Sequence, residues 1–347
     1  MKPNMASLLA STGVFTCALA VVALVIAAAG YDLSGAARAA VEGAVGSPFA
    51  VLSATLKRTA PFLMLGLAVA VAFRAGVLNI GAEGQFLAGA AAACAVGLFA
   101  TPVLGRATLL LEIAAGMVAG ACWAGIAAML KRRFAVAEVV STLLLNFVAA
   151  NVVAYLVRGP LQEPTGAYPQ SSMLEPIARL PLLIDGQRLH AGFPIALILA
   201  LATWWFFRST AAGFRFRMTG SGRAAAASAG LINVNAVQMH ALIASGAIAG
   251  LAGACEITGV TYVLYEGLSP GYGYTAIAVA MLGGLHPLAI VASATLFGAL
   301  GAGADAMQRN AGVPAGFAVV AAALVVLGVL AIPRTLRLLR PAWPGRP

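Results

Sequence analysis

Apolar blocks of about 20 residues recur along nearly the whole chain, and short polar stretches separate them. A hydrocarbon core about 30 Å thick requires about 20 apolar residues per helix, so such a block is long enough to cross a membrane. Strands of a membrane barrel would alternate apolar and polar residues, and these solid blocks do not alternate. With only 9% charged residues, the chain also lacks the polar surface of a soluble domain. The sequence therefore predicts an all-α, polytopic integral membrane protein, with residues 1–347 forming a single transmembrane domain.

We expect about ten transmembrane helices. The first block, residues 8–30, exceeds the apolar region of about 7–15 residues in a signal peptide, which favours an uncleaved first span. A second span begins near Thr59. An Ala- and Gly-rich block follows a polar segment in each half of the chain, which raises an inverted repeat as a hypothesis. The other predicted spans are residues 80–100, 107–130, 139–157, 192–207, 236–260, 274–285, 287–303 and 313–332.

The distribution of Lys and Arg predicts the orientation. Three basic segments contain no acidic residue, namely residues 131–133, the loop 208–235 and the tail 333–347. Because positively charged loops stay on the cytoplasmic side, we expect these segments and both termini to be cytoplasmic, in a cell inner (plasma) membrane. The polar segments 31–58 and 159–190 then form outward-facing loops.

Several classes of function lack the motifs that they need. None of the three lysines follows a glycine, so no GxxxxGK[ST] phosphate loop is present, and the chain is not expected to hydrolyse ATP. No GxSxG or HExxH motif appears, so we expect no enzyme activity and no cofactor. The cysteines and histidines lack metal-ligand spacing, and the basic residues behind the net charge of +10 are too dispersed for nucleic acid. Transport is the leading class.

The stretch FRAGVLNIGAEGQF, residues 73–86, places polar residues inside the most apolar part of the chain. A charge at the bilayer centre costs roughly 2.5–3.5 kcal/mol, so Arg74 and Glu83 must face protein or water. Gly76, Gly81 and Gly84 supply the backbone freedom for a broken helix that lines a cavity. The alternative is an ordinary cytoplasmic turn, with Glu83 near a helix N-terminus. The spacing of these residues favours neither.

A polar stripe follows one face of the expected helix 139–157, where Glu138, Thr142 and Asn146 recur at helical spacing beside Ser141. Hydrogen bonds between helices, worth about 0.6 kcal/mol each, are the simpler explanation, and a polar pathway is the other. Glu256 is a lone carboxylate near the end of a span, which we interpret as solvated or paired.

The segment TGSGRAAAASAGLIN, residues 219–233, combines a Gly-broken polar start with an Ala-rich run that Gly230 closes. Alanine has the highest helix propensity, and glycine commonly ends a helix. The pattern predicts a short amphipathic helix on the cytoplasmic face, suited to docking a partner. A plain surface connector is the alternative.

Five stretches together resemble a known family: FRAGVLNIGAEGQF, EVVSTLLLNFVAANVVAYLVRGP, the loop ending AGLINV, SGAIAGLAGACEITG and GYGYTAIAVAMLGGLHP. Over residues 60–303 the chain looks like the permease subunits of ATP-binding-cassette (ABC) importers for nucleosides and simple sugars. These belong to the branched-chain amino acid and ribose permease superfamily. The GAEGQ form and the long outward loop are similar to the longer permease of a nucleoside importer. One residue departs from the family pattern. His286 stands directly before Pro287, at a position where a small polar residue, commonly Asn, is expected, and the role of this position is open.

The resemblance implies partners and residue roles. One importer would contain two permeases, commonly a heterodimer, with two ATPase subunits that bind the ATP and an extracytoplasmic substrate-binding protein. The resemblance also favours the broken helix over the turn. The implied translocation pathway and helix break comprise Arg74, Asn79, Gly81, Glu83, Gly84, Gln85, Ser141 and Asn146. The implied coupling helix, which docks into the ATPase, comprises Gly220, Arg223, Ala224, Ala225, Ala226 and Gly230.

The expected function is translocation of a nucleoside or a related simple sugar, energised by the separate ATPase subunits. A pathway of amides and hydroxyls without a fixed charge pair suits a neutral solute better than an ion. A secondary transporter or channel for a small polar solute is the alternative, and it would need coupling carboxylates near the membrane midplane. Four tyrosines could stack on a nucleobase, or form an ordinary interfacial belt: Tyr262, Tyr265, Tyr272 and Tyr274. The sequence does not decide whether the substrate is a nucleoside, a nucleobase compound or a sugar.

Overall fold

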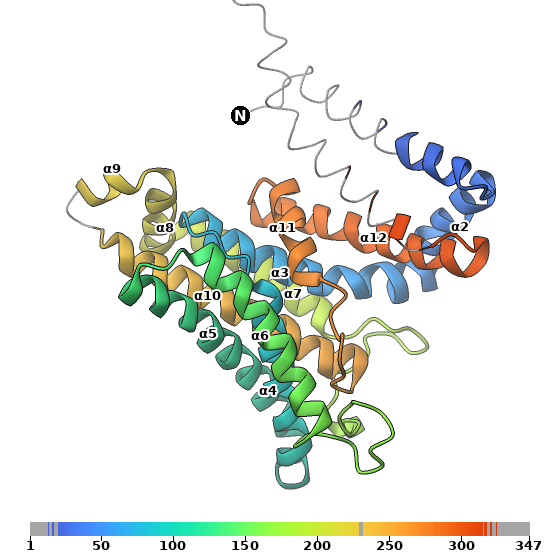
Figure 1. The fold of residues 1–347 in the computed structure, drawn as a ribbon, viewed down its shortest axis with the longest axis horizontal. Helices are drawn as coiled ribbons and strands as arrows, with labels where there is room; N and C mark the ends of the chain where they lie inside the picture. The colour runs from blue at the N-terminus through green and yellow to red at the C-terminus, as the bar shows by residue number, and fades with distance from the viewer. Residues whose placement is uncertain are drawn as a thin grey trace, which may run out of the picture. The chain divides into compact units, whose positions relative to one another are not determined.

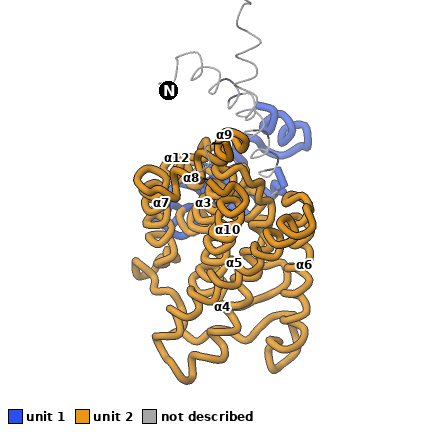
Figure 2. Tube along the Cα trace, turned by 90° about the vertical axis from the view of Figure 1, so that its left-hand side faces the viewer, with its two compact units in different colours: residues 1–55, 297–347 blue, residues 56–296 orange. Residues whose placement is uncertain are grey.

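The computed structural model describes residues 20–228 and 232–314, together with residues 13, 16, 316, 317, 320 and 324. Across these residues the backbone is helical except for connections and three isolated β-bridges, which confirms the all-α prediction. The chain divides into two compact units, residues 1–55 with 297–347 and residues 56–296 (Figure 2). The expectation of a single transmembrane domain stays a prediction.

The unit 56–296 is a helical bundle (Figure 1). Of its helices, α3 and α10 are mostly buried, whereas α6 and α7 leave most of their residues at the surface of the bundle. A π-helix, η4 (Ile257–Thr261), extends α10, and two short 3₁₀ helices, η2 (Gly105–Ala107) and η3 (Pro176–Ala178), lie in connections. The α-helices are α3 (Lys57–Arg74), α4 (Ala82–Leu104), α5 (Thr108–Phe134), α6 (Glu138–Arg158), α7 (Gly192–Ser209), α8 (Ala211–Ser221), α9 (Arg223–Ser228), α10 (Val234–Glu256) and α11 (Tyr272–Leu282).

Small residues let α4, α5 and α10 pack backbone to backbone. A Cβ atom on Gly250 of α10 would stand 2.0 Å from the carbonyl oxygen of Gly116 in α5. A Cβ atom on Gly89 of α4 would stand 2.4 Å from the Cα atom of the same Gly250. Interfaces of this kind, in which glycine permits close approach, are common between membrane helices. The three helices therefore form a tightly packed frame.

Six described helical stretches are long and apolar enough to cross a membrane, which confirms the polytopic prediction. The expected number of ten helices is not reached within the described residues. One stretch contains two helices, because η2 joins α4 directly to α5. The six stretches are Ala50–Arg74, Ala82–Phe134, Glu138–Arg158, Gly192–Ser209, Val234–Thr261 and Pro287–Ala311.

Two expected elements differ from the structure. The predicted span 274–285 corresponds to α11, whose 11 residues rise only about 16 Å, too little to cross a core of about 30 Å. The predicted outward loop 31–58 is largely helical, with α2 (Leu33–Val45) followed by the π-helix η1 (Ala50–Leu56), which continues into α3. The run Ala50–Leu56 is apolar and contains no helix breaker, so the charges of Lys57 and Arg58 do not interrupt the helix.

In the unit 1–55 with 297–347, α2 contacts the C-terminal part of α12 (Pro287–Ala311). A Cβ atom on Gly43 would stand 2.1 Å from that of Ala306. Asp32 caps α2, and hydrogen bonds from Ser34 lower the pKa of its carboxyl group. Most of the predicted span 8–30, most of the predicted span 313–332 and the tail 333–347 lie outside the described residues.

The loop 159–190 is held to the far end of α10 by backbone hydrogen bonds. The Leu174 N–H donates to the Tyr262 carbonyl at 2.9 Å, and the Leu180 N–H donates to the Thr258 carbonyl at 2.8 Å. Arg158, at the end of α6, pairs with Glu266 and lowers the pKa of its carboxyl group. This loop therefore lies at the end of the unit 56–296 that is opposite to the start of α10.

Candidate functional site

The connection between α3 and α4, residues 75–81, descends into the bundle, and we call it the helix break. At its start, the Gly76 carbonyl accepts a hydrogen bond from Gln238, near the beginning of α10. Further along, Asn79 donates to Ser245, which lies seven residues deeper in α10. Seven helical residues rise about 10 Å, so irregular backbone extends about 10 Å into the bundle. This depth favours the broken helix over an ordinary turn, and the helix break stays a prediction.

Asn79 uses its whole side-chain amide to hold the break. Its Nδ2 donates to Gln85 Oε1 and to Ser245 Oγ, each at 2.9 Å. Its Oδ1 accepts from the Gly81 N–H at 2.9 Å and from Gln85 Nε2 at 3.1 Å. Ser245 in turn donates to the Ala68 carbonyl of α3 at 2.6 Å. Backbone groups in a water-free interior need protein partners, and these buried side chains supply them.

Helix α6 closes the break from another side. Asn146 Oδ1 accepts from the Gly84 N–H at 2.8 Å, and its Nδ2 donates to the Ile80 carbonyl at 2.9 Å. Thr142 Oγ1 accepts from the Ile80 N–H at 3.4 Å. Ser141 is buried too, but its hydroxyl bonds within its own helix. The polar stripe of α6 thus makes hydrogen bonds between elements, the simpler of its two explanations, and a role in a pathway stays a prediction.

The first turns of α4 and α11 meet at Glu83. Glu83 Oε2 accepts from the Gly273 N–H at 2.6 Å, and the side chain is buried. A Cβ atom on Gly273 would stand 2.3 Å from the Glu83 backbone nitrogen, so the two helix starts touch backbone to backbone. Helix N-termini carry a partial positive charge, and the Glu83 carboxylate lies where it stabilises two of them. Two helices therefore begin face to face inside the bundle.

Aromatic rings pack beside this junction. Tyr272 meets Phe62 and Phe86 edge to face, with ring centroids 5.3 and 6.0 Å apart. Tyr262 lies under the guanidinium of Arg179, which is 4.5 Å from its ring centroid. Stacking on a nucleobase stays a prediction for Tyr262, Tyr265, Tyr272 and Tyr274.

The loop 208–235 contacts the chain where α3 ends and the break begins. A Cβ atom on Gly220, near the end of α8, would stand 2.1 Å from the carbonyl oxygen of Arg74, the last residue of α3. The Arg74 guanidinium lies 4.8 Å from the ring centroid of Phe207 in α7. This charge therefore faces protein, as its position in an apolar segment requires.

A short helix, α9, forms where the Ala-rich run predicts one. Ala226 is buried at 1% exposure, and Ala224 and Ala225 are exposed. Gly230 lies outside the described residues. Since Ala226 packs against the chain itself, the face of α9 that remains free for a partner contains Ala224 and Ala225.

Three important partners were not singled out from the sequence, namely Ser245, Gly273 and Gln238. Ser245 lies in SGAIAG, where the glycines indicate close packing, and the hydroxyl among them was the available signal. Gln238 is a lone amide in the first turns of an apolar span, which is a comparable signal. Nothing in the sequence indicates that Gly273 meets Glu83.

Two further predictions concern charges and metals. Glu256 is buried at 5% exposure, so it is not solvated, and its pairing stays a prediction. Among the residues that the structure describes, no three His, Cys, Asp or Glu side chains gather in a way suited to a metal ion. His286 is exposed just before α12, and its role stays open.

Two helices, α4 and α11, begin inside the bundle and are surrounded by helices long enough to span a membrane. This arrangement is typical of polytopic membrane proteins with discontinuous helices. In such proteins substrate sites commonly lie where the helices are interrupted. Comparison with known families is specific. Residues 51–332 match the family described as the branched-chain amino acid transport system, permease component, and the chain belongs to this family.

The chain is similar in sequence to several proteins named as ABC transporter permeases. The chain is 37% identical to the guanosine ABC transporter permease protein NupP of Bacillus subtilis, over 90% of this chain and 89% of that one. It is 37% identical to the glucose ABC transporter permease protein TsgB13 of Haloferax volcanii, over 80% and 75% of the two chains. It is 28% identical to the nucleoside ABC transporter permease protein NupB of Lactococcus lactis, over 78% and 77%. No solved structure matches the chain.

Proposed function

We propose that this chain is the membrane-spanning permease subunit of an ABC importer, and that it translocates a nucleoside or a related simple sugar. One observation carries the choice of solute. The buried side chains that hold the break in place, and whose hydrogen bonds a solute could replace, are uncharged amides and a hydroxyl: Asn79, Gln85, Asn146 and Ser245. Such groups hydrogen-bond the hydroxyls of a neutral solute and give no net attraction to an ion. Relatives named for guanosine, nucleosides and glucose support the same choice.

In this proposal the break changes its hydrogen-bond partners as the solute passes. In the structure, Asn79 and Gln85 satisfy each other and the neighbouring backbone. When the pathway opens, hydroxyls of the solute take over some of these bonds, so no buried polar group is left unpaired. Glu83 keeps the starts of α4 and α11 together during this exchange.

The energy comes from separate subunits. ATP is bound and hydrolysed by two ATPases, and the exposed face of α9 docks one of them. A second permease, in a heterodimer, completes the pathway, and a substrate-binding protein delivers the solute to the side of the loop 159–190. The basic segments 131–133 and 208–235 face the cytoplasm, together with both termini. Lys131 and Arg223 both donate hydrogen bonds to Gln238 of α10, which supports placing the two segments on the same side of the membrane.

An uptake assay tests the function. The chain, its partner permease and the ATPases are reconstituted in liposomes with the binding protein, and uptake of radiolabelled guanosine, ribose and glucose is measured. We expect uptake of at least one of them that needs hydrolysable ATP and is abolished by a non-hydrolysable analogue. Equal uptake by the permeases without the ATPases would instead indicate a channel or secondary transporter.

Substitution in α9 tests the docking site. Ala225→Glu places a carboxylate on the exposed face, where burial in an interface without a partner costs several kcal/mol. We expect the variant to reach the membrane and pair with the second permease, but to lose the ATPases in pull-down experiments. Ala226→Glu does not test docking, because that side chain is buried within the permease. Retention of the ATPases by Ala225→Glu would move the docking site to residues 131–133.

A further inference from the structure

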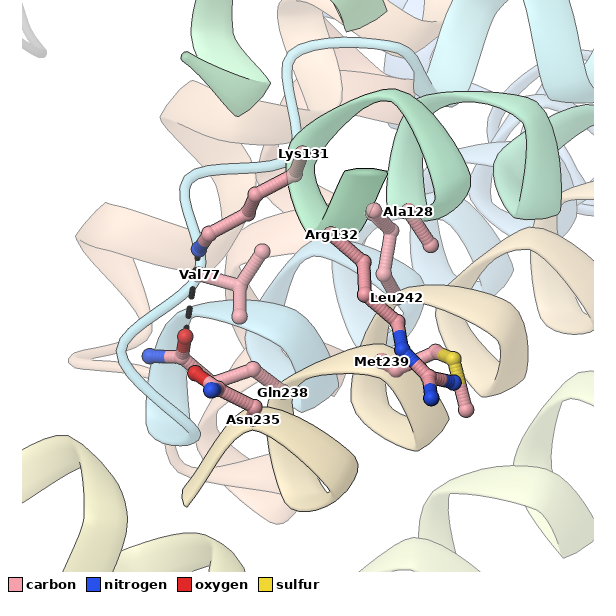
Figure 3. A pocket seen from close by; sticks show the side chains of 8 residues that line it. All are labelled: Val77, Ala128, Lys131, Arg132, Asn235, Gln238, Met239 and Leu242. Carbon is pink, nitrogen blue, oxygen red and sulfur yellow. Dashed lines mark hydrogen bonds between the residues drawn. The ribbon is translucent and has the colours of Figure 1, made fainter. Parts of the chain in front are cut away.

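Gln238 joins three separate elements through one buried side chain. Its Oε1 accepts hydrogen bonds from Lys131 Nζ, at 3.1 Å, and from the guanidinium of Arg223 (Figure 3 shows the former). Its Nε2 donates to the Gly76 carbonyl at 3.4 Å. The residue is only 3% exposed. A single amide therefore links the end of α5, the start of α9 and the first turn of the helix break.

The same elements also touch through their backbones. A Cβ atom on Gly220 would stand 3.1 Å from the Gly76 nitrogen, so the end of α8 lies directly on the break. Lys131 also pairs with Glu138 at 3.1 Å, at the start of α6, the helix that bonds the other end of the break. The loop 208–235 thus contacts the start of the break directly, and it is linked to the other end through Gln238, Lys131 and α6.

The contacts of Gln238 differ in strength. The two bonds to its Oε1 come from cations, and hydrogen bonds with a charged partner are roughly twice as strong as neutral ones. The bond to the Gly76 carbonyl is neutral and long at 3.4 Å. When α9 moves, Gln238 would therefore stay with Lys131 and Arg223, and its weaker bond to Gly76 would be strained first, which shifts the start of the break.

Space for such a movement lies beside the junction. A pocket of about 150 Å³ is lined by both polar and apolar side chains next to Gln238 (Figure 3). The pocket lies between the end of α5, the start of α10 and Val77 of the break. Close-packed interiors have few voids larger than a water molecule, so this end of the frame is packed less tightly than its glycine contacts. The lining residues are Val77, Ala128, Lys131, Arg132, Asn235, Gln238, Met239 and Leu242.

We infer that Gln238 is a positioning residue that ties the loop 208–235 to the helix break, so that displacement of α9 shifts the break. The inference rests on the proposed function, in which α9 docks an ATPase. Gln238 itself need not touch the solute or the ATPase. It acts by fixing the position of Gly76 relative to Arg223.

Hydrogen exchange on the assembled transporter in lipid nanodiscs tests this link without any solute. Arg223→Met removes one cation from Gln238 at an exposed position, so the fold is not at risk. We expect amides 76–81 to exchange about tenfold faster in Arg223→Met and in Gln238→Leu. Arg215→Met, an exposed cation of the same loop on α8, is the matched control and should leave their exchange unchanged. Unchanged exchange at 76–81 in Arg223→Met would overturn the inference, even if Gln238→Leu failed to fold.

Transport per ATP gives a second readout that a merely structural role would not move. Gln238→Leu should lower uptake per ATP hydrolysed about tenfold while the ATPases stay bound, and Arg223→Met should lower it about tenfold for the ATPases that it retains. The double variant should be no worse than the poorer single variant, because both act through one contact. Losses that multiply in the double variant would contradict the link. If the unaltered transporter showed no ATP-driven uptake, the proposed function would fail, and the exchange experiment would still decide on Gln238.

Discussion

Replacement of Asn79 by alanine should destabilise the protein more than any other single polar substitution in the break. The change removes the four hydrogen bonds of the Asn79 amide. At about 0.6 kcal/mol per bond inside a membrane protein, these are worth about 2–3 kcal/mol. The Gly81 N–H also loses its side-chain acceptor in a buried site, which adds about 1–3 kcal/mol. We therefore expect a loss of about 3–6 kcal/mol in the free energy of unfolding.

The measurement is unfolding by sodium dodecyl sulfate in bicelles, followed by circular dichroism. Asn151→Ala is the matched control, because Asn151 is exposed on α6 and, among the described residues, bonds only to the Phe147 carbonyl of its own helix. Its loss should stay within about 0.5 kcal/mol. A loss below about 1 kcal/mol for Asn79→Ala would refute the reasoning, since no more than one or two of the bonds could then contribute. Uptake should fall together with stability, because the same bonds position the break.

Three further predictions concern stability in the same assay. Gly250→Ala should lower the free energy of unfolding by about 1–3 kcal/mol, because the new Cβ atom would stand 2.0 Å from the Gly116 carbonyl oxygen. Gly125→Ala is the control: its new Cβ atom would have no described atom within 4 Å, so this variant should be neutral or stabilising. Glu112→Met should raise stability by about 1–2 kcal/mol, since both oxygens of this buried carboxyl group lack a hydrogen-bond partner among the described residues, and a lower stability would contradict this. Burial lowers the pKa of His190 from 6.5 to about 4, so between these values only the unfolded chain gains the proton. Stability should fall by up to about 3 kcal/mol as the pH drops through this window, and His190→Gln should remove that pH dependence.

Some of this architecture follows from the sequence because its cause is local. Apolar blocks of sufficient length predict spans wherever they occur, and α5, α6 and α10 lie close to the expected residues. The Ala-rich run predicts α9 for the same reason, since helix propensity is a property of the run itself. The polar residues of FRAGVLNIGAEGQF mark a candidate break, because buried irregular backbone needs side chains that bond it, but by themselves they leave an ordinary turn open.

Other features depend on contacts between distant residues, which no local pattern reports. The stretch 274–285 is as apolar as a span, but α11 begins inside the bundle because Gly273 docks on the start of α4. The residues 75–81 are consistent with a turn until Ser245 fixes the depth of Asn79. Ala226 belongs to an Ala run whose members look equivalent, and only its packing against the bundle distinguishes it from Ala225.

The contrast between glycine contacts and amide contacts separates what is rigid in the unit 56–296 from what is able to move. Where α10 meets α5 at Gly250 and Gly116, backbone touches backbone, and no side-chain rotation relieves a displacement. Around the break, backbone contacts occur at Gly220 and Gly273, but the hydrogen bonds that hold the break run through rotatable side chains such as Asn79, Gln85 and Gln238. Exchange of one such bond for another with a solute hydroxyl or with water costs little, because the number of bonds is conserved. In the proposed mechanism, movement imposed at α9 reaches the break, while the frame of α4, α5 and α10 stays in place.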